Sequence, residues 1–158
     1  MKPEKPTGPF FAKGEKIVLK KDGTWIADGT EITHEQTRDL FYRAIHFDKA
    51  EKKYYLEVGF ERIFIEVEDT CFFVTALEKS ANKLSAKLSN TASESISPKN
   101  LSYQNETLYL SLANGERARF LSAPYYDLLQ ELKEDKEYYY LKLGKERANL
   151  EKKSVKKK

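Results

Sequence analysis

The chain has 158 residues, of which 40% are hydrophobic and 34% charged, a composition that excludes a largely disordered protein. Five lysines lie in the last seven residues, and removing their charges from the net charge of +3 leaves −2 for residues 1–151. The overall charge therefore gives no reason to expect a non-specific nucleic-acid binder, whose folded surface would be strongly basic.

The cysteine content and the hydropathy indicate in which cellular compartment the protein is expected. The single cysteine, Cys71, excludes an internal disulfide framework. No apolar run approaches the roughly 18 residues of a membrane span, and the first residues lack the apolar core of a secretory signal. We therefore expect a soluble, cytoplasmic protein with no membrane partner.

The N-terminal part predicts short strands. Residues 1–13 form an arm, since three of the five prolines lie in residues 1–9. A strand is expected at Lys16–Lys20, and the tight-turn signals Asp22-Gly23 and Asp28-Gly29 enclose a second strand at Trp25. Together they predict a small meander.

A helix is expected to start near Thr33, whose hydroxyl can cap it, with Gln36 completing a capping box. Helical spacing then gives an apolar face and an opposite ridge. The apolar face comprises Thr37, Leu40, Phe41, Ala44 and Ile45, and the ridge comprises His34, Arg38, Tyr42 and His46. A polar connection, Asp48–Lys53, follows.

A β-hairpin is predicted at Tyr54–Glu66. Leu56, Ile63 and Ile65 alternate with polar or outward positions, and Gly59-Phe60 has glycine first, as a type II′ turn prefers. Cys71–Leu77, rich in aromatic and β-branched residues, is the next expected strand.

The second half repeats this order of signals. One exposed strand is expected at Leu84–Leu88, a loop at Ser89–Asn100, and strands at Tyr103–Leu112 and Glu116–Leu121. A helix starts at Ser122-Ala123-Pro124, with the serine hydroxyl as its cap. A charged link, Lys133–Glu137, leads to a strand at Tyr138–Leu143 and a turn at Gly144-Lys145.

The hairpin sequence itself occurs twice. YYLEVGFERIFIE at Tyr54–Glu66 and YYLKLGKERANLE at Tyr139–Glu151 share seven of thirteen residues. Because the upstream signals also recur, we predict a duplication and an α+β fold: two tandem related units, each a short helix packed on an antiparallel sheet. The predicted boundaries are 1–13 for the arm, 14–69 and 70–151 for the repeats, and 152–158 for a disordered lysine-rich tail.

Catalytic and metal-binding signals are sparse. The sequence contains no HExxH, CxxC, phosphate-binding glycine loop or nucleophile elbow. His34 and His46, twelve residues apart on one expected helix, would lie about 18 Å apart, too far to share a metal. We expect no metal, no cofactor and no enzymatic activity.

Three features have two interpretations each. The repeated Glu61-Arg62 and Glu146-Arg147 could bring guanidinium groups to an anion, or form cross-strand ion pairs on a wet sheet face, which we favour. The ridge on the first helix could contact a nucleotide, but a solvated helix side is the commoner meaning. The tyrosine pairs could stack bases on an open sheet face, although core and rim packing is favoured.

Several short motifs occur in a fixed order along nearly all of residues 15–150. They are Asp22-Gly23-Thr24-Trp25, Leu40-Phe41, Val67-Glu68-Asp69 and Tyr125-Tyr126-Asp127-Leu128. Their order resembles an uncharacterised bacterial family, domain of unknown function 1285. His34 stands where the family pattern usually has arginine. The resemblance implies two related α+β domains, the second similar to a pleckstrin-homology fold, and a cleft between them for a nucleotide or nucleic-acid-like ligand.

We therefore hypothesise a non-enzymatic binding module for an anionic, base-containing ligand. The predicted ligand-binding residues are Trp25 and Tyr126 as apolar walls and His34, Arg38, Arg62, Arg117 and Arg119 as hydrogen-bond donors. The alternative is a protein–protein adaptor without a small-molecule ligand, which would use a sheet edge such as Leu84–Leu88 or an exposed aromatic patch.

Overall fold

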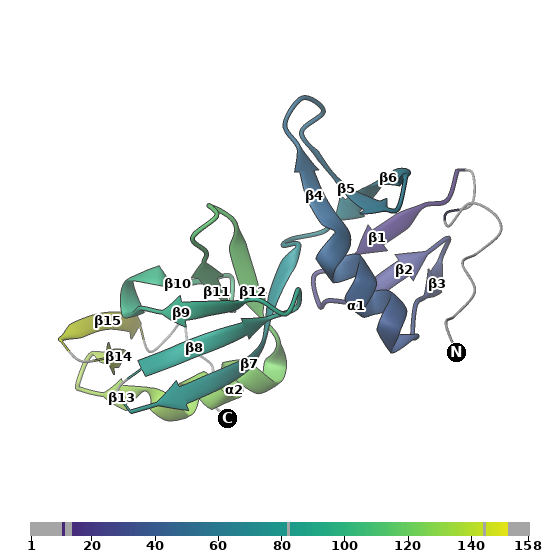
Figure 1. Ribbon diagram of the computed structural model, residues 1–158. Helices are drawn as coiled ribbons and strands as arrows, with labels where there is room; N and C mark the ends of the chain where they lie inside the picture. Colours follow the sequence, from purple (N-terminus) through teal and green to yellow (C-terminus); the bar gives the residue numbers. More distant parts are fainter. Residues whose placement is uncertain (1–10, 12–13, 82, 144, 152–158) are drawn as a thin grey trace. The chain divides into compact units, whose positions relative to one another are not determined.

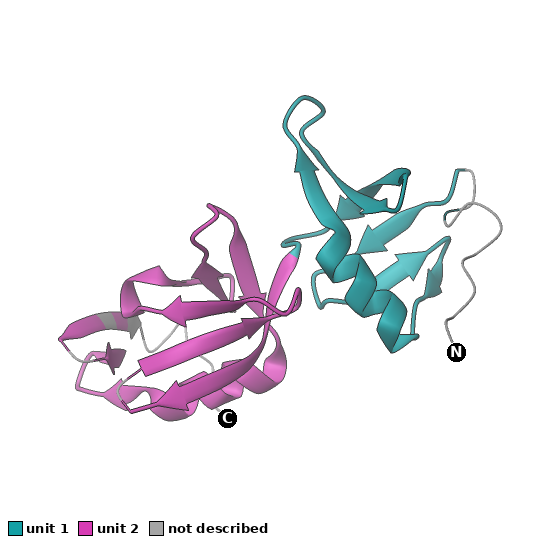
Figure 2. Ribbon diagram, viewed as in Figure 1, with its two compact units in different colours: residues 1–71 teal, residues 72–158 magenta. Residues whose placement is uncertain are grey.

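The computed structural model describes residues 11, 14–81, 83–143 and 145–151. The chain divides into two compact units, residues 1–71 (unit 1) and 72–158 (unit 2), coloured separately in Figure 2. Each unit has a six-stranded sheet with a ten-residue helix packed on it (Figure 1). The predicted α+β fold of two tandem related units is confirmed. The predicted arm and lysine-rich tail lie almost wholly outside the described residues.

Unit 1 is built on a sheet whose strand order is β3-β2-β1-β6-β5-β4. Neighbouring strands are antiparallel except β1 and β6, which are parallel. Alternating residues of the central strands face helix α1 and form the core with it, because one face of the sheet is covered. The elements are β1 (Ile17–Leu19), β2 (Trp25–Ala27), β3 (Thr30–Glu31), α1 (Glu35–Ala44), β4 (Ile45–Asp48), β5 (Lys53–Val58) and β6 (Glu61–Val67).

Helix α1 differs from its prediction at both ends. His34, not Thr33, is the N-cap, and its Nδ1 accepts a hydrogen bond from the Thr37 backbone N–H. The helix ends at Ala44, and Ile45 begins strand β4 by pairing with Leu56. The sheet hydrogen bonds that this pairing provides are lost if the helix continues for another turn. His46 is therefore a strand residue, and the predicted four-residue helical ridge does not exist.

Unit 2 contains a larger sheet, ordered β10-β11-β12-β7-β8-β9, and a small one, ordered β13-β14-β15. Helix α2 packs on β7. The elements are β7 (Phe72–Ser80), β8 (Lys83–Leu88), β9 (Ser93–Ile96), η1 (Pro98–Asn100), β10 (Leu101–Gln104), β11 (Thr107–Ser111), β12 (Arg117–Phe120), α2 (Ser122–Glu131), β13 (Lys133–Glu134), β14 (Tyr138–Leu143) and β15 (Glu146–Glu151).

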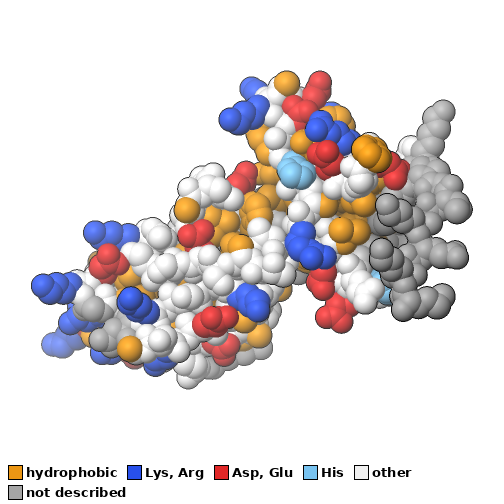
Figure 3. Space-filling model, viewed as in Figure 1, with side chains coloured by type: hydrophobic (Ala, Val, Ile, Leu, Met, Phe, Trp, Pro, Cys, Tyr) orange, Lys and Arg blue, Asp and Glu red, His pale blue; other side chains and the backbone are white. Residues whose placement is uncertain are grey.

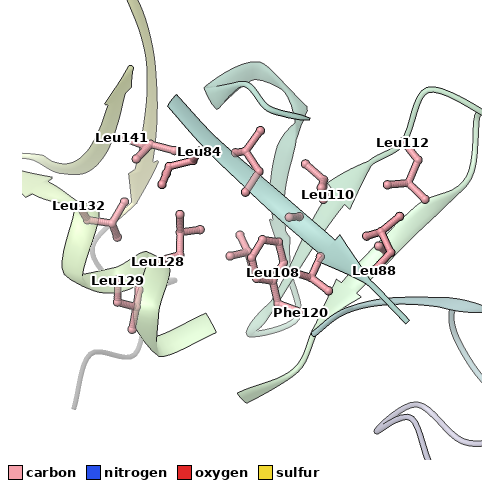
Figure 4. Close-up of a cluster of buried hydrophobic side chains, with 14 residues drawn as sticks. Leu84, Leu88, Leu108, Leu110, Leu112, Phe120, Leu128, Leu129, Leu132 and Leu141 are labelled. Carbon is pink, nitrogen blue, oxygen red and sulfur yellow. The ribbon is translucent and has the colours of Figure 1, made fainter. Parts of the chain in front are cut away.

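Leucines from the sheet and the helix meet in one core in unit 2. Figure 4 shows Leu128 of α2 pointing toward the side chains of the sheet, and Leu129 of α2, Leu84 of β8, Leu110 of β11 and Leu141 of β14 belong to the same cluster. All five are at most 4% exposed. At about 1.5–3 kcal/mol for each fully buried leucine, this cluster is the main source of stability in unit 2.

Three predictions for unit 2 are wrong. Strand β8 pairs with β7 on one side and β9 on the other, so Leu84–Leu88 is neither exposed nor a free edge. The predicted loop at Ser89–Asn100 contains β9 and η1, because Ile96 alternates inward into the core despite its polar neighbours. The N-cap of α2 is Leu121, which makes no side-chain cap hydrogen bond, so Ser122 is not the capping residue.

The sequence repeat is a structural repeat. Both copies form two-stranded antiparallel hairpins, β5–β6 and β14–β15, in the same register. In each copy a helix precedes the hairpin and is followed by a short strand, β4 or β13, that pairs with the hairpin's first strand. The matching cross-strand pairs are Tyr54–Ile65 with Tyr139–Leu150, Leu56–Ile63 with Leu141–Ala148, and Val58–Glu61 with Leu143–Glu146.

Within the described part of the chain, no helix is long and apolar enough to span a bilayer.

Candidate functional site

The seven predicted ligand-binding residues are divided between the units. Trp25, His34, Arg38 and Arg62 lie in unit 1. Arg117, Arg119 and Tyr126 lie in unit 2. Within unit 1, α1 covers one face of the sheet and carries His34 and Arg38, whereas Arg62 is on the opposite face.

Trp25 is a core residue and not an exposed wall. Its side chain is fully buried, and its ring lies edge-on to Phe41 at 5.3 Å and to Tyr42 at 5.5 Å between centroids. The Tyr42 hydroxyl donates a 2.5 Å hydrogen bond to the Gly23 carbonyl in the adjacent turn. This cluster attaches α1 to the Asp22-Gly23 turn, which was predicted as a turn but not as a partner of the helix.

The environment of Tyr42 makes its hydroxyl a weaker acid than a free tyrosine. Burial is the main cause that raises the pKa of the Tyr42 hydroxyl from 10.0 to about 12. The nearby indole N–H of Trp25 offsets part of this effect, although it does not make a hydrogen bond of normal geometry. The hydroxyl therefore stays protonated at neutral pH and remains a donor to Gly23.

Arg62 belongs to the outer face of the β4–β5–β6 part of the sheet, opposite α1. Its neighbours on β6 in the same orientation are Phe64 and Glu66, which are exposed, whereas Ile65 faces the core. Arg62 is opposite Glu57 on β5, and Nη2 of Arg62 lies 3.4 Å from Oε2 of Glu57. The cross-strand ion pair favoured from the sequence is therefore present.

Three aromatic side chains form a row across this outer face. His46 of β4 pairs with Tyr55 of β5, and Tyr55 pairs with Phe64 of β6, so the three side chains project from the same face. The His46 and Tyr55 rings are stacked with centroids 5.3 Å apart, and the Phe64 ring is edge-on to Tyr55 at 6.2 Å. Phe64 remains 50% exposed. We call His46, Tyr55 and Phe64 the aromatic row.

Cations flank the aromatic row on both sides. The guanidinium of Arg62 lies over the Tyr55 ring at 4.7 Å, and the Lys53 ammonium lies 5.7 Å from the centre of the Phe64 ring. Figure 3, viewed with α1 toward the reader as in Figure 1, shows hydrophobic, basic and acidic side chains intermingled over the α1 side of unit 1 as well. The outer face thus combines an exposed ring with positive charge, and carboxylates moderate that charge.

A shallow hollow adjoins the row. It has a volume of about 420 Å³ and is lined by Phe64 and Lys53, together with Glu15, Lys16, Ile17, Ile65 and Glu66. Lys16 and Glu66 form an ion pair at its margin, with 3.5 Å between Nζ and Oε1. The volume lies within the range of roughly 300–1,000 Å³ that small-molecule sites occupy. A ring stacked on Phe64 would be bordered by this hollow.

The equivalent face of unit 2 is different. Lys133, Tyr140 and Asn149 take the row positions, so only the central ring is kept. Arg147 again lies over the tyrosine, at 3.7 Å, but its guanidinium is also bound to Asp135 at 2.6 Å and to the Asn149 side chain at 2.8 Å. Three partners within unit 2 hold this arginine side chain, so its role there is structural.

The three predicted residues of unit 2 do not form one site. Arg117 and Arg119 project from the same side of β12, where the Arg117 guanidinium lies 3.9 Å from the centre of the Tyr109 ring and donates to Gln104. Tyr126 lies on α2, 38% exposed, next to Tyr125 at 5.3 Å between ring centroids. Arg117 is thus already engaged within the unit.

Among the described residues, no group of three or more His, Cys, Asp or Glu side chains could hold a metal ion.

Two solved structures resemble the chain along most of its length. One is a DUF1285 family protein from Silicibacter pomeroyi DSS-3, with a TM-score of 0.64, 18% identity, and coverage of 86% of this chain and 79% of that one. The other is a DUF1285 family protein from Shewanella baltica OS155, with a TM-score of 0.58, 20% identity, and coverage of 77% and 96%. The fold is that of DUF1285 proteins.

At these identities the likeness concerns the DUF1285 fold alone, and neither description states a ligand or an activity. No family model matches the sequence, and no curated protein matches it. The resemblance stated from short sequence motifs is therefore supported by structure. In this chain the DUF1285 fold presents the aromatic row on the outer face of unit 1, a feature of the chain's own residues.

Sequence reasoning missed two members of the row. His46 was placed on a helix, and Phe64 was seen only as one of the outward positions of a strand. The available signal was an outward phenylalanine between Arg62 and Glu66. Exposing a large apolar side chain to water is unfavourable, so such a residue often marks a contact surface.

Proposed function

We propose that this protein is a non-enzymatic binding module and that the outer face of β4, β5 and β6 holds a nucleotide or a single-stranded nucleic-acid segment. The observation that supports this most is the aromatic row with its half-exposed Phe64, next to Lys53 and Arg62. Base stacking on an exposed aromatic side chain contributes about 1–3 kcal/mol per base and tolerates any sequence.

The row is organised before a ligand arrives. Tyr55 is in contact with His46, Phe64 and Arg62, so its ring cannot rotate freely on the sheet surface. A ligand therefore loses less binding energy to the ordering of side chains. The exposed ring of Phe64 offers the stacking surface, and the hollow beside it provides room for a base.

Electrostatics limits the affinity. Lys53 and Arg62 can each approach a phosphate, but Glu57 and Glu66 lie on the same face, and Glu57 is paired with Arg62. We expect only about one or two phosphates to be neutralised. The slope of log K against log salt should then be about −1 to −2, far shallower than that of a basic groove binder.

The test is fluorescence anisotropy with a labelled 12-nucleotide single-stranded DNA, comparing wild type with Phe64→Ser. Removing the stacking ring should weaken binding about tenfold, which corresponds to roughly 1.4 kcal/mol. Tyr126→Ser is the matched control, because Tyr126 is a partly exposed ring in unit 2 and should leave the affinity unchanged. Equal binding by wild type and Phe64→Ser would contradict the proposal.

A second candidate function is a protein–protein adaptor, and a different observation favours it. Phe60, at the tip of the β5–β6 hairpin, is fully exposed, and Phe47 on the inner side of edge strand β4 is 46% exposed. Exposed aromatic anchors of this kind carry much of the binding energy in protein interfaces. If Phe60→Ser abolishes association with a co-purifying protein while Phe64→Ser has no effect on DNA, the adaptor is the function.

A further inference from the structure

We infer that the outer face of unit 1 prefers a guanine base, whose Watson–Crick edge would donate two hydrogen bonds to the Glu66 carboxylate while its ring stacks on Phe64. Lys16, the ion-pair partner of Glu66, would donate to the O6 atom of the same base. This inference rests on the function proposed above, because it concerns the same surface. It adds a preference among bases to a stacking contact that accepts any base.

The ion pair and the exposed ring border the same hollow. Phe64, Glu66 and Lys16 all belong to the lining of the hollow of about 420 Å³. Phe64 and Glu66 are two residues apart on β6, so their side chains project from the same face of the sheet. A base that stacks on the half-exposed ring of Phe64 therefore has its edge in the same hollow as the Glu66 carboxylate.

Two neighbouring strands fix the positions from which Lys16 and Glu66 extend. Strands β1 and β6 are parallel, and Val18 is aligned with Glu66. Lys16 directly precedes β1, where its N–H donates to Oδ1 of Asp28 at 2.9 Å and its carbonyl accepts from the Asp28 N–H at 2.8 Å. The two side chains meet between these strands, so a hydrogen-bond donor lies beside an acceptor at the margin of the hollow.

The ion pair leaves hydrogen-bonding capacity for a ligand. Nζ of Lys16 lies 3.5 Å from Oε1 of Glu66, and the two side chains are 66% and 65% exposed. Exposed pairs of this kind contribute little to stability, so a ligand loses little by sharing or replacing the contact. An ionised carboxylate has about four lone-pair sites, and one ammonium group does not saturate them. Glu66 can therefore accept hydrogen bonds from a base while it remains beside Lys16.

The charge of the hollow is balanced. Two lysines, Lys16 and Lys53, and two glutamates, Glu15 and Glu66, are part of its lining. A site that recognised phosphate alone would gather positive charge without carboxylates. The balanced lining favours recognition of a neutral base through hydrogen bonds, and Lys53, beside the Phe64 ring, is placed to contact an attached phosphate.

Guanine has the edge that matches this pair of side chains. Its N1–H and its amino group are adjacent donors that fit the two oxygens of one carboxylate, and its O6 acceptor lies next to them, where a lysine can donate. Adenine and cytosine each present one amino group beside a ring nitrogen that accepts, and that nitrogen would repel the second carboxylate oxygen. Uracil and thymine have a single N–H between two carbonyl groups.

The test compares guanosine 5′-monophosphate with inosine 5′-monophosphate, which lacks only the amino group of the base. Binding to the full chain is followed by the ¹H–¹⁵N signals of Phe64 and Glu66. The guanosine nucleotide should bind about fivefold more tightly, because the inosine nucleotide leaves one carboxylate oxygen without its donor. In Glu66→Gln this preference should disappear, since the amide has a single acceptor oxygen and no charge.

Glu31→Gln is the matched control, because it removes an exposed carboxylate from β3 of the same sheet without changing the lining of the hollow. This variant should keep the preference of the wild type. If Glu66 has only a structural role, Glu66→Gln weakens the binding of both nucleotides equally and leaves the preference unchanged. That result would overturn the inference.

Failure of guanine recognition is distinguishable from failure of the proposed function. Equal binding of the two nucleotides, or binding of the single-stranded DNA but of neither nucleotide, overturns guanine recognition alone when Phe64→Ser still weakens DNA binding. If neither nucleotide nor the DNA binds, both proposals are wrong.

A trinucleotide with guanine between two thymines identifies the source of the base. Tighter binding of the trinucleotide than of guanosine 5′-monophosphate indicates a nucleic-acid strand as the ligand, and equal or weaker binding indicates a free nucleotide.

Discussion

Single residues decide which side chains each face of the unit 1 sheet presents. Strand alternation correctly placed Ile63 and Ile65 inward and Arg62 and Phe64 outward, because side chains of a strand point to opposite faces in turn. A cross-strand ion pair was also favoured from the sequence, and the structure supplies Glu57 as the partner of Arg62. The position of His46 could not be predicted in this way. Helical spacing and strand pairing compete at Ile45, and only the pairing of Ile45 with Leu56 decides for the strand.

Tyr42 provides a test at the residue scale. Its hydroxyl has a pKa raised from 10.0 to about 12 in the folded protein. A raised pKa contributes stability that is fully present below pH 10 and is lost as pH rises toward 12, because the unfolded chain ionises first. Because the side chain is partly exposed, this loss in the free energy of unfolding should be roughly 1–2 kcal/mol.

Tyr42→Phe should therefore cost about 1 kcal/mol at pH 8, because the hydrogen bond to the Gly23 carbonyl is removed. The difference from wild type should shrink as pH rises above 10, since wild type alone loses the contribution of this hydroxyl. Urea unfolding at pH 8 and pH 10.5 measures both effects, with Tyr126→Phe as control. A difference in the free energy of unfolding that stays constant with pH would show that the pKa of the Tyr42 hydroxyl is not raised in the folded protein.

The repeated elements show how two copies of one hairpin diverge. In both copies an arginine lies over a tyrosine. In both, an aspartate at the end of the short strand (Asp48) or directly after it (Asp135) accepts hydrogen bonds from two backbone N–H groups of the following turn. The repeated glutamates also accept from another segment, Glu61 from the Phe11 N–H and Glu146 from the Ser97 hydroxyl. The contacts that the two copies share therefore stabilise the fold, whereas the residues at the positions of the aromatic row differ between the copies.

The divergence at the row favours unit 1 as the binding unit. Phe64 in unit 1 corresponds to Asn149 in unit 2, and Asn149 accepts from the Nε of Arg147. Replacing the amide by a phenyl ring removes that acceptor and exposes an aromatic surface. The sequence repeat predicts the hairpin that both copies share. Only the packing around each arginine shows that the Arg147 side chain is held by contacts within unit 2.

Asp135 gives the prediction at the element scale. The N–H groups of Tyr138 and Glu137 and the guanidinium of Arg147 hold the pKa of the Asp135 carboxyl below its usual 3.8. A lowered pKa contributes stability that is present above pH 3.8 and is lost as pH falls through the lowered value. Asp135→Asn should remove this contribution at pH 7 and have a smaller effect at pH 2.5.

Hydrogen exchange at β13 and β14 measures that change locally. In Asp135→Asn the amides of Glu137 and Tyr138 should exchange faster at pH 7, because the carboxylate that accepts from them is replaced by a weaker acceptor. Glu137→Gln, a neighbouring exposed carboxylate, is the control. Unchanged protection in Asp135→Asn would show that the turn does not depend on this charge.

At the scale of the whole molecule, the sequence predicts the duplication and the fold class but not the aromatic row. The hairpins, both helices and most strands follow from turn signals and periodicity. The buried state of β8 and the presence of β9 do not, because their pairing joins segments that lack local signals. Trp25 was assigned to a ligand wall, whereas its packing on Phe41 makes it a core residue.

The central claim is that the aromatic row of unit 1 is a ligand-binding surface and that the matching positions of unit 2 are not. The most direct test is a ¹H–¹⁵N titration of the full chain with the 12-nucleotide single-stranded DNA, followed amide by amide. The predicted result is a set of saturable shifts centred on His46, Tyr55 and Phe64, with Lys133, Tyr140 and Asn149 unmoved. Shifts centred on β13–β15, or no saturable shift at millimolar DNA, would contradict it.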